Sequence, residues 1–364
     1  MSYISAFGTA TPTNKFSQST IAEFMLAVMH PDSNQSRMIR TVFKMSGITH
    51  RYSVLEDYGK TADFTVYPVN GQQHFPSTQK RIGLYRKHAL PLSLESVHDL
   101  FLKHPVPISE ITHLIVVSCT GMYAPGLDID LIKTLNLPRT IDRVCINFMG
   151  CYAAFNALKT ADAFCRSNPK AKVLIVCTEL CSIHFQHTPT EDNILANALF
   201  GDGAAAMLVE NSGDADKKLV IENFYNDLFL AGEKDMAWSI GDEGFQMKLS
   251  SYIPELIKAE IGNLTRNLLQ KINKTKEDIK YFAFHPGGKR ILQAIDDELK
   301  LGQKNSWAYS VLERFGNMSS PTVVFVLKEI FESLQRPDND EYVLSAAFGP
   351  GLTLESMLLK VELN

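Results

Sequence analysis

Short apolar runs of strand length alternate with segments of helical periodicity along this chain, and this alternation is the feature that most limits its fold. His113–Ser118, Arg143–Phe148 and Lys172–Cys177 are runs rich in Val, Ile and Leu, which indicates buried strands. Between the last two, Tyr152–Arg166 places apolar side chains at helical spacing. The pattern predicts an α/β fold.

The second half of the chain repeats this plan. Ile279–Phe284 and Glu341–Ala346 have the composition of strands, and Pro321–Leu334 that of a helix. Three pairs of matched positions have offsets of 167, 167 and 169 residues: Leu114 with Tyr281, Phe148 with Phe315, and Leu174 with Val343. The nearly constant offset predicts a duplicated βαβ unit. We expect the halves to be residues 1–211 and 212–364, because the polar stretch 211–218 is typical of a surface turn.

Composition excludes several classes of protein. The chain has 364 residues, of which 45% are hydrophobic, so it can bury a large core. Charged residues make up 21% and the formal net charge is −4, which gives no indication of binding to nucleic acid or to an anionic membrane. No run of 18 apolar residues is present, so we expect no membrane span. The first residues lack the pattern of a signal peptide, and the expected location is cytoplasmic.

The cysteines do not form a metal-binding pattern. There are six, with no CxxC pair and no second half to the CxxxC formed by Cys177 and Cys181. Zinc sites need four ligands at characteristic spacing. We therefore predict no metal site and expect most of these cysteines to be small buried hydrophobic residues.

The candidate nucleophile is Cys151. A predicted strand runs into Gly150 and a predicted helix begins just after Cys151, so the cysteine stands at a strand-to-helix elbow. Unpaired N–H groups and the helix dipole favour a thiolate there, which predicts a lowered pKa for the thiol. The segment alone also fits a buried structural cysteine, because a nucleophile needs a partner base or oxyanion donors.

The segment FHPGGK at 284–289 offers the first partner. His285 stands at the carboxyl end of a predicted strand, which is where ligands of α/β sheets gather. A lone histidine is commonly structural. The two glycines that follow favour a site here, because they let the backbone approach a bound group.

The segment FGNMSSP at 315–321 offers the second partner. It occupies the repeat position that matches the Cys151 elbow, so Asn317 is the pseudo-symmetric neighbour of the nucleophile turn. Its amide N–H can bind a thioester carbonyl or an enolate oxygen. Asn and Ser are also favoured helix caps, and capping by Ser319 or Ser320 fits the same segment.

The order Cys151, His285, Asn317 at two related elbows resembles the thiolase superfamily. Four segments resemble more closely the type III polyketide synthases, the chalcone synthase family, in its bacterial-type members: ALFGDGAA at 198–205, HPGG at 285–288, GNMSS at 316–320 and FGPGLT at 348–353. The resemblance runs from about residue 4 to residue 360. The condensing enzymes that start fatty-acid synthesis usually carry an NAAG-like segment, which GNMSS does not match.

The resemblance implies a thiolase-like fold, in which duplicated βαβαβ halves form a five-layered αβαβα core. It also implies a malonyl-CoA-dependent acyltransferase. Cys151 takes an acyl group from a starter acyl-CoA, with His285 holding the thiolate as an imidazolium pair. His285 and Asn317 then stabilise the enolate formed when the malonyl group loses CO2, and the enolate attacks the acyl-Cys151 thioester. Further rounds and cyclisation follow, with CoA thioesters as substrates and no cofactor.

Two positions fall where this family has phenylalanines that gate the cavity. Phe200 lies between the CoA tunnel and the cavity, a placement that is equally compatible with core packing. The second gating position falls on Met247, where this chain departs from the family.

Other residues fall at positions that shape the family's cavity. Thr120, Ala124 and Cys181 are small, as in members that accept long fatty acyl starters. Removing side-chain volume there leaves space for an alkyl tail. His184 and Trp238 are large and favour a small or aromatic product. We expect a medium or long acyl starter and an alkylpyrone or alkylresorcinol product.

Arg37, Arg40 and Lys44 have the spacing i, i+3, i+7 and share one helix face. On spacing alone they fit a solvated basic stripe equally well. The family places three basic residues at this spacing, which favours contacts with the phosphates of CoA. The CoA site is expected to extend to Gly287, Gly288 and Lys289.

The family also implies a homodimer with two separate sites. Two other functions remain open. One is a single-round condensing enzyme, which releases a β-keto acid or diketide without a ring. The other is an inactive acyl-CoA-binding protein on the same fold, which binds without turnover.

Overall fold

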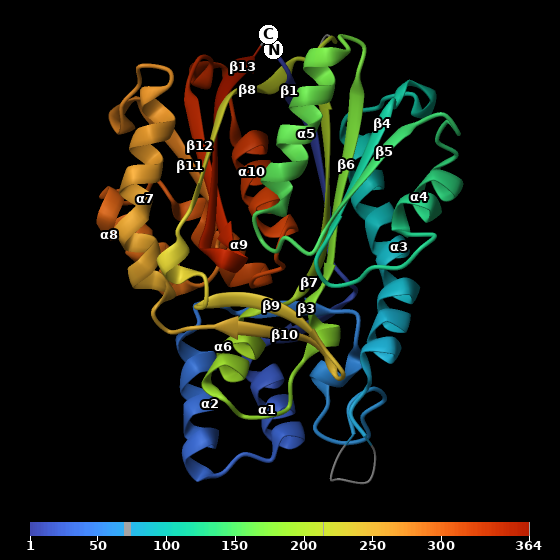
Figure 1. Ribbon diagram of the computed structural model, residues 1–364, viewed down its shortest axis with the longest axis vertical. Helices are drawn as coiled ribbons and strands as arrows, with labels where there is room; N and C mark the ends of the chain where they lie inside the picture. Colours follow the sequence, from blue (N-terminus) through green and yellow to red (C-terminus); the bar gives the residue numbers. More distant parts are fainter. Residues whose placement is uncertain (69–73, 214, 364) are drawn as a thin grey trace.

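The computed structural model describes residues 1–68, 74–213 and 215–363, and its central feature is a nine-stranded sheet (Figure 1). The strand order is β11-β12-β13-β8-β1-β7-β6-β4-β5. The N-terminal half contributes β1 (Tyr3–Ala10), β4 (His113–Ser118), β5 (Asp142–Asn147), β6 (Lys172–Leu180) and β7 (Asp202–Glu210). The C-terminal half contributes β8 (Lys217–Leu228), β11 (Ile279–Phe284), β12 (Tyr342–Gly349) and β13 (Thr353–Leu363).

The two halves of the sheet have the same pairing pattern. In the N-terminal half β4 and β6 are parallel, and β7 and β1 follow as antiparallel neighbours. In the C-terminal half β11 and β12 are parallel, and β13 and β8 follow in the same way. The halves join where Tyr3 and Ile4 of β1 pair with Val220 and Leu219 of β8. The predicted duplication is confirmed, and the predicted strands at 113–118 and 279–284 coincide with β4 and β11.

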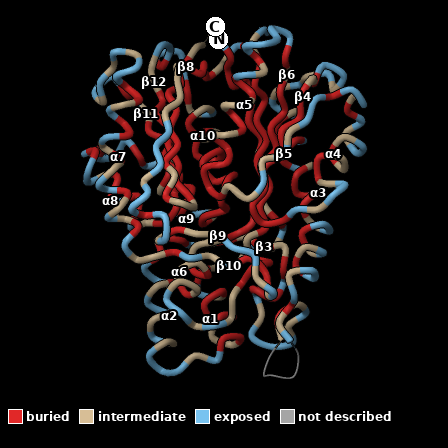
Figure 2. The backbone as a smooth tube through the Cα atoms, in the orientation of Figure 1, coloured by how far each residue is buried: buried red, intermediate tan, exposed pale blue. Residues whose placement is uncertain are grey.

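Helices complete five layers (Figure 1). The central helices α5 (Ala153–Ser167) and α10 (Pro321–Ser333) lie between the two halves of the sheet. The outer layers are α3 (Thr78–Lys103) with α4 (Leu127–Leu135), and α7 (Ile253–Gln270) with α8 (Lys289–Leu299). A helix between two sheets must be apolar all round, and Val323, Val324, Val326 and Leu327 of α10 are all fully buried. Figure 2 shows this central layer buried, while the outer helices expose one side.

In one of the three matched pairs, the two residues belong to different kinds of element. Phe148 follows the edge strand β5, whereas Phe315 ends the helix α9 (Ser306–Phe315). The helix forms because Ala308, Val311 and Leu312, at i, i+3 and i+4, are the residues that become buried. Among the described residues of the C-terminal half, no strand corresponds to β5, and the elbow at Asn317 follows a helix.

A smaller region lies below the sheet in Figure 1. It contains α1 (Gln18–Met29), α2 (Ser33–Met45), α6 (Glu191–Leu199), the pair β2 (Asn14–Ser17) and β3 (His50–Ser53), and the hairpin β9 (Met236–Gly241) and β10 (Gly244–Leu249). The polar stretch 211–218 begins directly after β7, but its last two residues, Lys217 and Lys218, already belong to β8. Residue 214 is outside the described residues. In the described part of the chain, no helix is both long and apolar enough to cross a membrane.

Candidate active site

Cys151 occupies the turn between β5 and α5, as the sequence predicts. Gly150 has φ +82°, and a Cβ at this position would come within 2.5 Å of Pro350 Cδ. Only glycine fits this left-handed turn without displacing the chain that packs over it. Phe148 also has a left-handed backbone, with φ +62°. The turn delivers Cys151 to the start of α5 with 8% of its surface exposed.

Asn317 is placed by hydrogen bonds from both sheet halves. Its backbone N–H donates to the Leu199 carbonyl, and its own carbonyl accepts from the Gly201 N–H, both at 2.9 Å. Its side-chain Oδ1 accepts from the Ser319 backbone N–H at 2.8 Å, and its Nδ2 donates to the Gly287 carbonyl at 3.3 Å. A backbone N–H only donates and a carbonyl only accepts, so the orientation of this amide is fixed.

His285 follows β11 directly and is fully buried. Its backbone N–H donates to the Ala346 carbonyl at 2.8 Å, and its ring meets Phe348 edge-on at 5.7 Å between centroids. Neither ring nitrogen has a hydrogen-bond partner among the described residues. Burial lowers the pKa of His285 to about 3, so the imidazole is neutral at neutral pH. An unpaired buried imidazole costs stability and is typical of a functional site.

The thiol of Cys151 corrects one expectation. Burial raises its pKa to about 12, although its hydrogen bonds with Ser319 and Asn317 act in the opposite direction. The prediction that the helix N-terminus lowers the pKa of this thiol is therefore wrong, because desolvation of the thiolate raises the pKa by more than the helix N-terminus lowers it. A charged sulfur in this buried environment is stabilised only when a cation lies beside it.

Cys151, His285 and Asn317 line one cavity of about 60 Å³. The Cys151 sulfur lies 4.0 Å from Asn317 Oδ1. Most of the residues predicted to gate or shape the cavity also line it: Thr120, Cys181, His184, Phe200, Trp238 and Met247. Ala124 does not line it. This residue is exposed, because the loop after β4 turns outward at Gly121, which packs tightly on the Tyr85 ring. The cavity prediction for Ala124 is thus wrong for the single chain.

His184 and Trp238 form a fixed wall of the cavity. His184 stacks on Phe245 at 4.2 Å between centroids and 7° between planes. Its Nδ1 accepts from the Phe245 backbone N–H at 3.0 Å, so the proton is on Nε2, which donates to the Thr120 carbonyl at 2.6 Å. The Trp238 indole N–H donates to the Cys119 carbonyl at 2.8 Å. These bonds hold the β9–β10 hairpin against the cavity.

Glu179 was not identified from the sequence. This fully buried residue of β6 accepts from the Cys119 backbone N–H at 2.9 Å, from Thr120 Oγ1 at 2.7 Å and from Ser320 Oγ at 2.6 Å. Burial raises its pKa, and these hydrogen bonds oppose the rise. It ties the strand end beside the nucleophile to the start of α10. In the sequence, the signal for this residue was a carboxylate at the end of a mainly apolar strand.

The predicted CoA residues fall into two groups. Gly287, Gly288 and Lys289 line an apolar groove of about 210 Å³, which shares Gly287, Ile291 and Leu249 with the catalytic cavity. Arg37, Arg40 and Lys44 are exposed on α2 and do not line the groove, although Val42 and Met45 of the same helix do. Arg40 forms an ion pair with Glu23. No cluster suited to a metal ion occurs in the described ranges.

Acid should destabilise the fold through two of its buried histidines, His184 and His285. His184 and His285 have a pKa of about 3 in the folded protein and about 6.5 when unfolded. Between these values the unfolded chain binds more protons, so the free energy of unfolding falls as the pH falls, by about 2 kcal/mol per histidine at pH 5. In urea unfolding, the free energy of unfolding of His285→Gln should fall by about 2 kcal/mol less between pH 7 and pH 5 than that of the wild type. His98 is exposed, so His98→Gln should lose as much stability as the wild type between pH 7 and pH 5. An equal loss in the wild type and both variants would show that His285 does not cause the acid destabilisation.

Comparison with known proteins agrees with this geometry. Residues 1–213 match the profile of the chalcone and stilbene synthases, N-terminal domain, and residues 222–362 match the profile of the C-terminal domain. An alpha-pyrone synthesis polyketide synthase-like protein, Pks18 of Mycobacterium tuberculosis, is 31% identical over 98% of this chain and 91% of its own length. A putative chalcone synthase of Bacillus subtilis is 28% identical over 100% of this chain and 99% of its own.

Solved structures show the same relationship. The crystal structure of PKS-I from the brown alga Ectocarpus siliculosus superposes with a TM-score of 0.90 at 26% identity, covering 99% of this chain and 98% of that one. The family uses acyl-CoA and malonyl-CoA thioesters as substrates. The chain belongs to the chalcone and stilbene synthase family and is a type III polyketide synthase, a malonyl-CoA-dependent acyltransferase.

Proposed function

We propose that Cys151, His285 and Asn317 carry out the covalent chemistry of this polyketide synthase. The observation that supports this best is His285, which lines the same cavity as Cys151 and whose two buried ring nitrogens have no hydrogen-bond partner in the described structure. A substrate oxygen or the sulfur proton can supply the missing partner. The N-terminal half, residues 1–211, then carries the nucleophile, and the C-terminal half, residues 212–364, carries the histidine and asparagine.

Loading begins when the Cys151 proton moves to His285. The sulfur attacks the starter thioester carbonyl, a C–S bond to Cys151 forms, and the C–S bond to CoA breaks. The proton passes from His285 to the leaving CoA sulfur. Histidine is then neutral again, which its burial favours. It keeps one N–H with which to donate a hydrogen bond in the next step.

Extension uses the same donors. The malonyl thioester oxygen accepts from His285 and from the Asn317 Nδ2 group, whose orientation the Ser319 N–H fixes. The C–C bond to the carboxylate breaks, CO2 leaves, and the electron pair forms an enolate. Fixed donors in a buried cavity stabilise the charge on its oxygen. The enolate carbon attacks the acyl carbonyl, and Cys151 leaves as thiolate.

We propose an alkyl α-pyrone as the product. The printed name of the Mycobacterium tuberculosis relative describes alpha-pyrone synthesis, and this favours a pyrone over a resorcinol. The cavity of about 60 Å³ with its fixed His184 and Trp238 wall favours a starter at the short end of the expected range. The cytoplasmic location stays a prediction.

We propose that CoA enters through the apolar groove beside α2 and α8. Lys289 lies in this groove, and the exposed cations of α2 stand on the helix that forms its rim. Arg37 and Lys44 form no ion pair in the described structure, so both are available to phosphate oxygens. Arg40 would leave its ion pair with Glu23 to bind a phosphate group.

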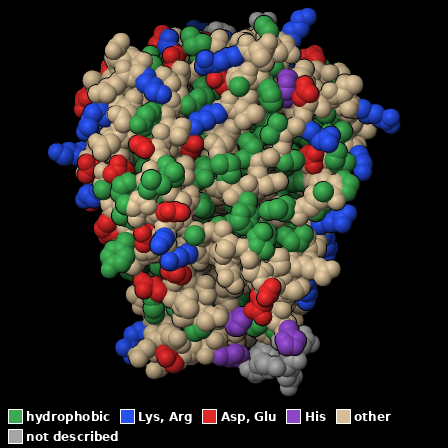
Figure 3. Space-filling model, in the orientation of Figure 1, with side chains coloured by type: hydrophobic (Ala, Val, Ile, Leu, Met, Phe, Trp, Pro, Cys, Tyr) green, Lys and Arg blue, Asp and Glu red, His purple; other side chains and the backbone are tan. Residues whose placement is uncertain are grey.

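We propose a homodimer formed through the face shown in Figure 3. Hydrophobic side chains gather across the middle of that face. Exposed apolar residues include Met122, Leu228, Leu230 and Ile240, and the edge strand β5 exposes most of its residues. Exposed apolar patches and unpaired edge strands are typical of interfaces.

Replacing the catalytic residues should separate two steps. Cys151→Ala should form no pyrone, because no acyl enzyme can form, while malonyl-CoA decarboxylation continues. His285→Ala and Asn317→Ala should lower decarboxylation by about 100-fold or more, the usual effect of losing an oxyanion donor. Product mass and CO2 release measure the two steps. Pyrone formation by Cys151→Ala would refute the assignment, and a diketide acid from the wild type would indicate a single-round enzyme.

The α2 cations should affect substrate binding and not turnover. Triple replacement of Arg37, Arg40 and Lys44 by Ala should raise KM for malonyl-CoA by about tenfold with kcat nearly unchanged, since uniform binding is lost. The salt dependence of KM should weaken as well. Exposed Lys170→Ala is the matched control. An unchanged KM in the triple variant would exclude this contact.

Sedimentation velocity should give twice the chain mass. Ile240→Lys, which puts a charge on the proposed interface, should shift the equilibrium toward monomer, while Leu102→Lys on the outer helix α3 should not. A monomeric wild type at micromolar concentration would rule out the stable dimer.

A further inference from the structure

Helix α6 ends against the Asn317 elbow, and carbonyl groups at this end bind partners outside the helix. The Leu199 carbonyl accepts from the Asn317 backbone N–H at 2.9 Å. The next carbonyl along the chain, that of Phe200, accepts from Nη1 of Arg51. Carbonyls at a helix C-terminus carry partial negative charge, so a cation is favoured there. Asn317 and Arg51 therefore bind neighbouring carbonyls of one helix end.

Arg51 is a buried cation. It belongs to β3, and only 1% of its surface is exposed. Its Nε donates to Gln18 Oε1 at 2.9 Å, while its Nη2 has no hydrogen-bond partner among the described residues. Burial lowers the pKa of Arg51 to about 10, so the guanidinium is still charged at neutral pH. A buried charge with an unpaired nitrogen costs stability, and such an arrangement is typical of functional sites.

The stem of Arg51 packs against the backbone beside Asn317. Gly316, the residue before Asn317, has φ +70°, and a Cβ at this position would come within 2.8 Å of Arg51 Cδ. Gly201 donates its N–H to the Asn317 carbonyl at 2.9 Å, and a Cβ on Gly201 would lie 3.5 Å from Arg51 Cβ. Arg51 therefore contacts the glycines that adjoin both sides of the backbone bridge between Phe200 and Asn317.

Gln18 joins this contact to α2, the helix that carries the proposed CoA cations. Its Nε2 donates to the Ala198 carbonyl of α6 at 2.7 Å and to Ser46 Oγ, at the end of α2, at 3.1 Å. The Arg51 guanidinium lies over the Phe43 ring of α2, 5.6 Å from the ring centroid. A guanidinium on an aromatic face is held by cation–π attraction. Arg51 and Gln18 together thus fasten the end of α6 to α2.

We propose that Arg51 is a positioning residue for malonyl-CoA decarboxylation and acts through Asn317. Its guanidinium holds the Phe200 carbonyl and its stem packs on Gly316, and both of these groups adjoin Asn317. The proposal rests on the proposed role of Asn317 as a donor to the enolate oxygen. A donor stabilises that oxygen only at hydrogen-bond distance, and a displacement of about 1 Å can lower the rate by about 100-fold.

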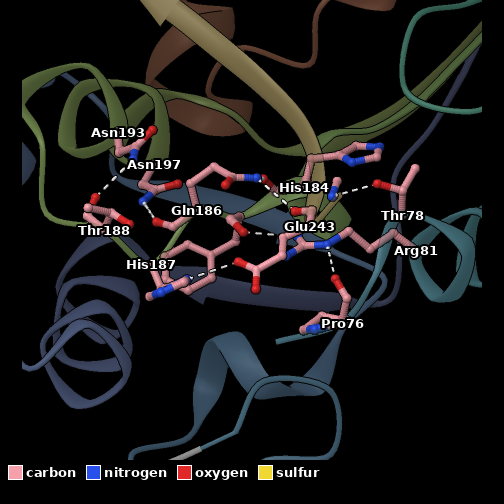
Figure 4. A network of polar contacts seen from close by, with 12 residues as sticks. Pro76, Thr78, Arg81, His184, Gln186, His187, Thr188, Asn193, Asn197 and Glu243 are labelled. Atoms are coloured by element: carbon pink, nitrogen blue, oxygen red, sulfur yellow. Dashed lines mark hydrogen bonds and ion pairs between the residues drawn. The ribbon is translucent and has the colours of Figure 1, made fainter. Parts of the chain in front are cut away.

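Arg81 offers a matched control, because it is a second fully buried arginine that binds backbone carbonyls. Figure 4 shows Arg81 beside Pro76, whose carbonyl accepts from Arg81 Nε at 2.9 Å. Its Nη1 donates to the carbonyls of Ile183 and Phe185 at 2.7 and 2.9 Å. These carbonyls belong to segments other than α6 and the Asn317 elbow. Replacing Arg81 therefore perturbs a buried arginine without releasing the groups that hold Asn317.

A double-mutant cycle on malonyl-CoA decarboxylation tests the positioning role. Arg51→Lys keeps the charge but cannot donate to Gln18 and Phe200 together. It should lower kcat for CO2 release by about tenfold with KM nearly unchanged, while the rate at which a starter acylates Cys151 stays at the wild-type value. In the Asn317→Ala background, Arg51→Lys should have almost no further effect, because the group that it positions is absent.

The control variant Arg81→Lys should change CO2 release by the same factor with and without Asn317→Ala. The same independence for Arg51→Lys, wild-type CO2 release by Arg51→Lys, or an equal fall in Cys151 acylation would overturn the positioning role and leave the synthase function intact. Wild-type CO2 release by Asn317→Ala would instead count against the proposed function. Should Arg51→Lys fail to fold, Gln18→Met, which removes the partner of Arg51 Nε, must show the same dependence on Asn317 in this cycle.

Discussion

The catalytic cavity depends on one backbone bridge between the two halves of the molecule. Asn317 pairs with Phe200, so an elbow of the C-terminal half is hydrogen-bonded directly to the strand entry of β7 in the N-terminal half. The halves also join through β1 and β8, and through the hydrogen bonds that Trp238 and Phe245 make to the N-terminal half. The bridge brings the nucleophile of one half and the donors of the other to a single space. Glu179 reinforces it through its bond to Ser320.

Burial then determines the chemistry of that space. The same desolvation raises the pKa of Cys151 to about 12 and lowers that of His285 to about 3. Each charged form is disfavoured alone, and a pair of opposite charges is disfavoured least. Burial therefore acts against each lone charge, and a thiolate is stabilised when an imidazolium lies beside it. Neutral histidine is also the form that can both donate to an enolate oxygen and accept the next proton.

Much of this architecture could be read from the sequence, since local patterns determine it. The apolar runs ending at Ser118 and Phe284 gave strands with the observed limits, because buried strands must be continuously apolar. The offset between the halves predicted two related elbows, and these do share one cavity. The helix at 306–315 was not predicted, because the constant offset matched only its last residue, Phe315, with Phe148 and carried no information on the residues before it.

What escaped prediction depends on contacts between distant segments. Ala124 shares the small size of a cavity residue, and only the path of its loop places it outside. The sign of the Cys151 pKa shift required knowing how completely the elbow is covered by Pro350 and its neighbours.

The most direct measurement is the site of acylation. Wild-type protein is incubated with a starter acyl-CoA, digested and mapped by mass spectrometry. The account predicts the acyl mass on the peptide that contains Cys151 and its loss on addition of malonyl-CoA, with release of an extended product. Acylation of Cys119 or Cys181 in its place, or an adduct that malonyl-CoA leaves unchanged, would contradict it.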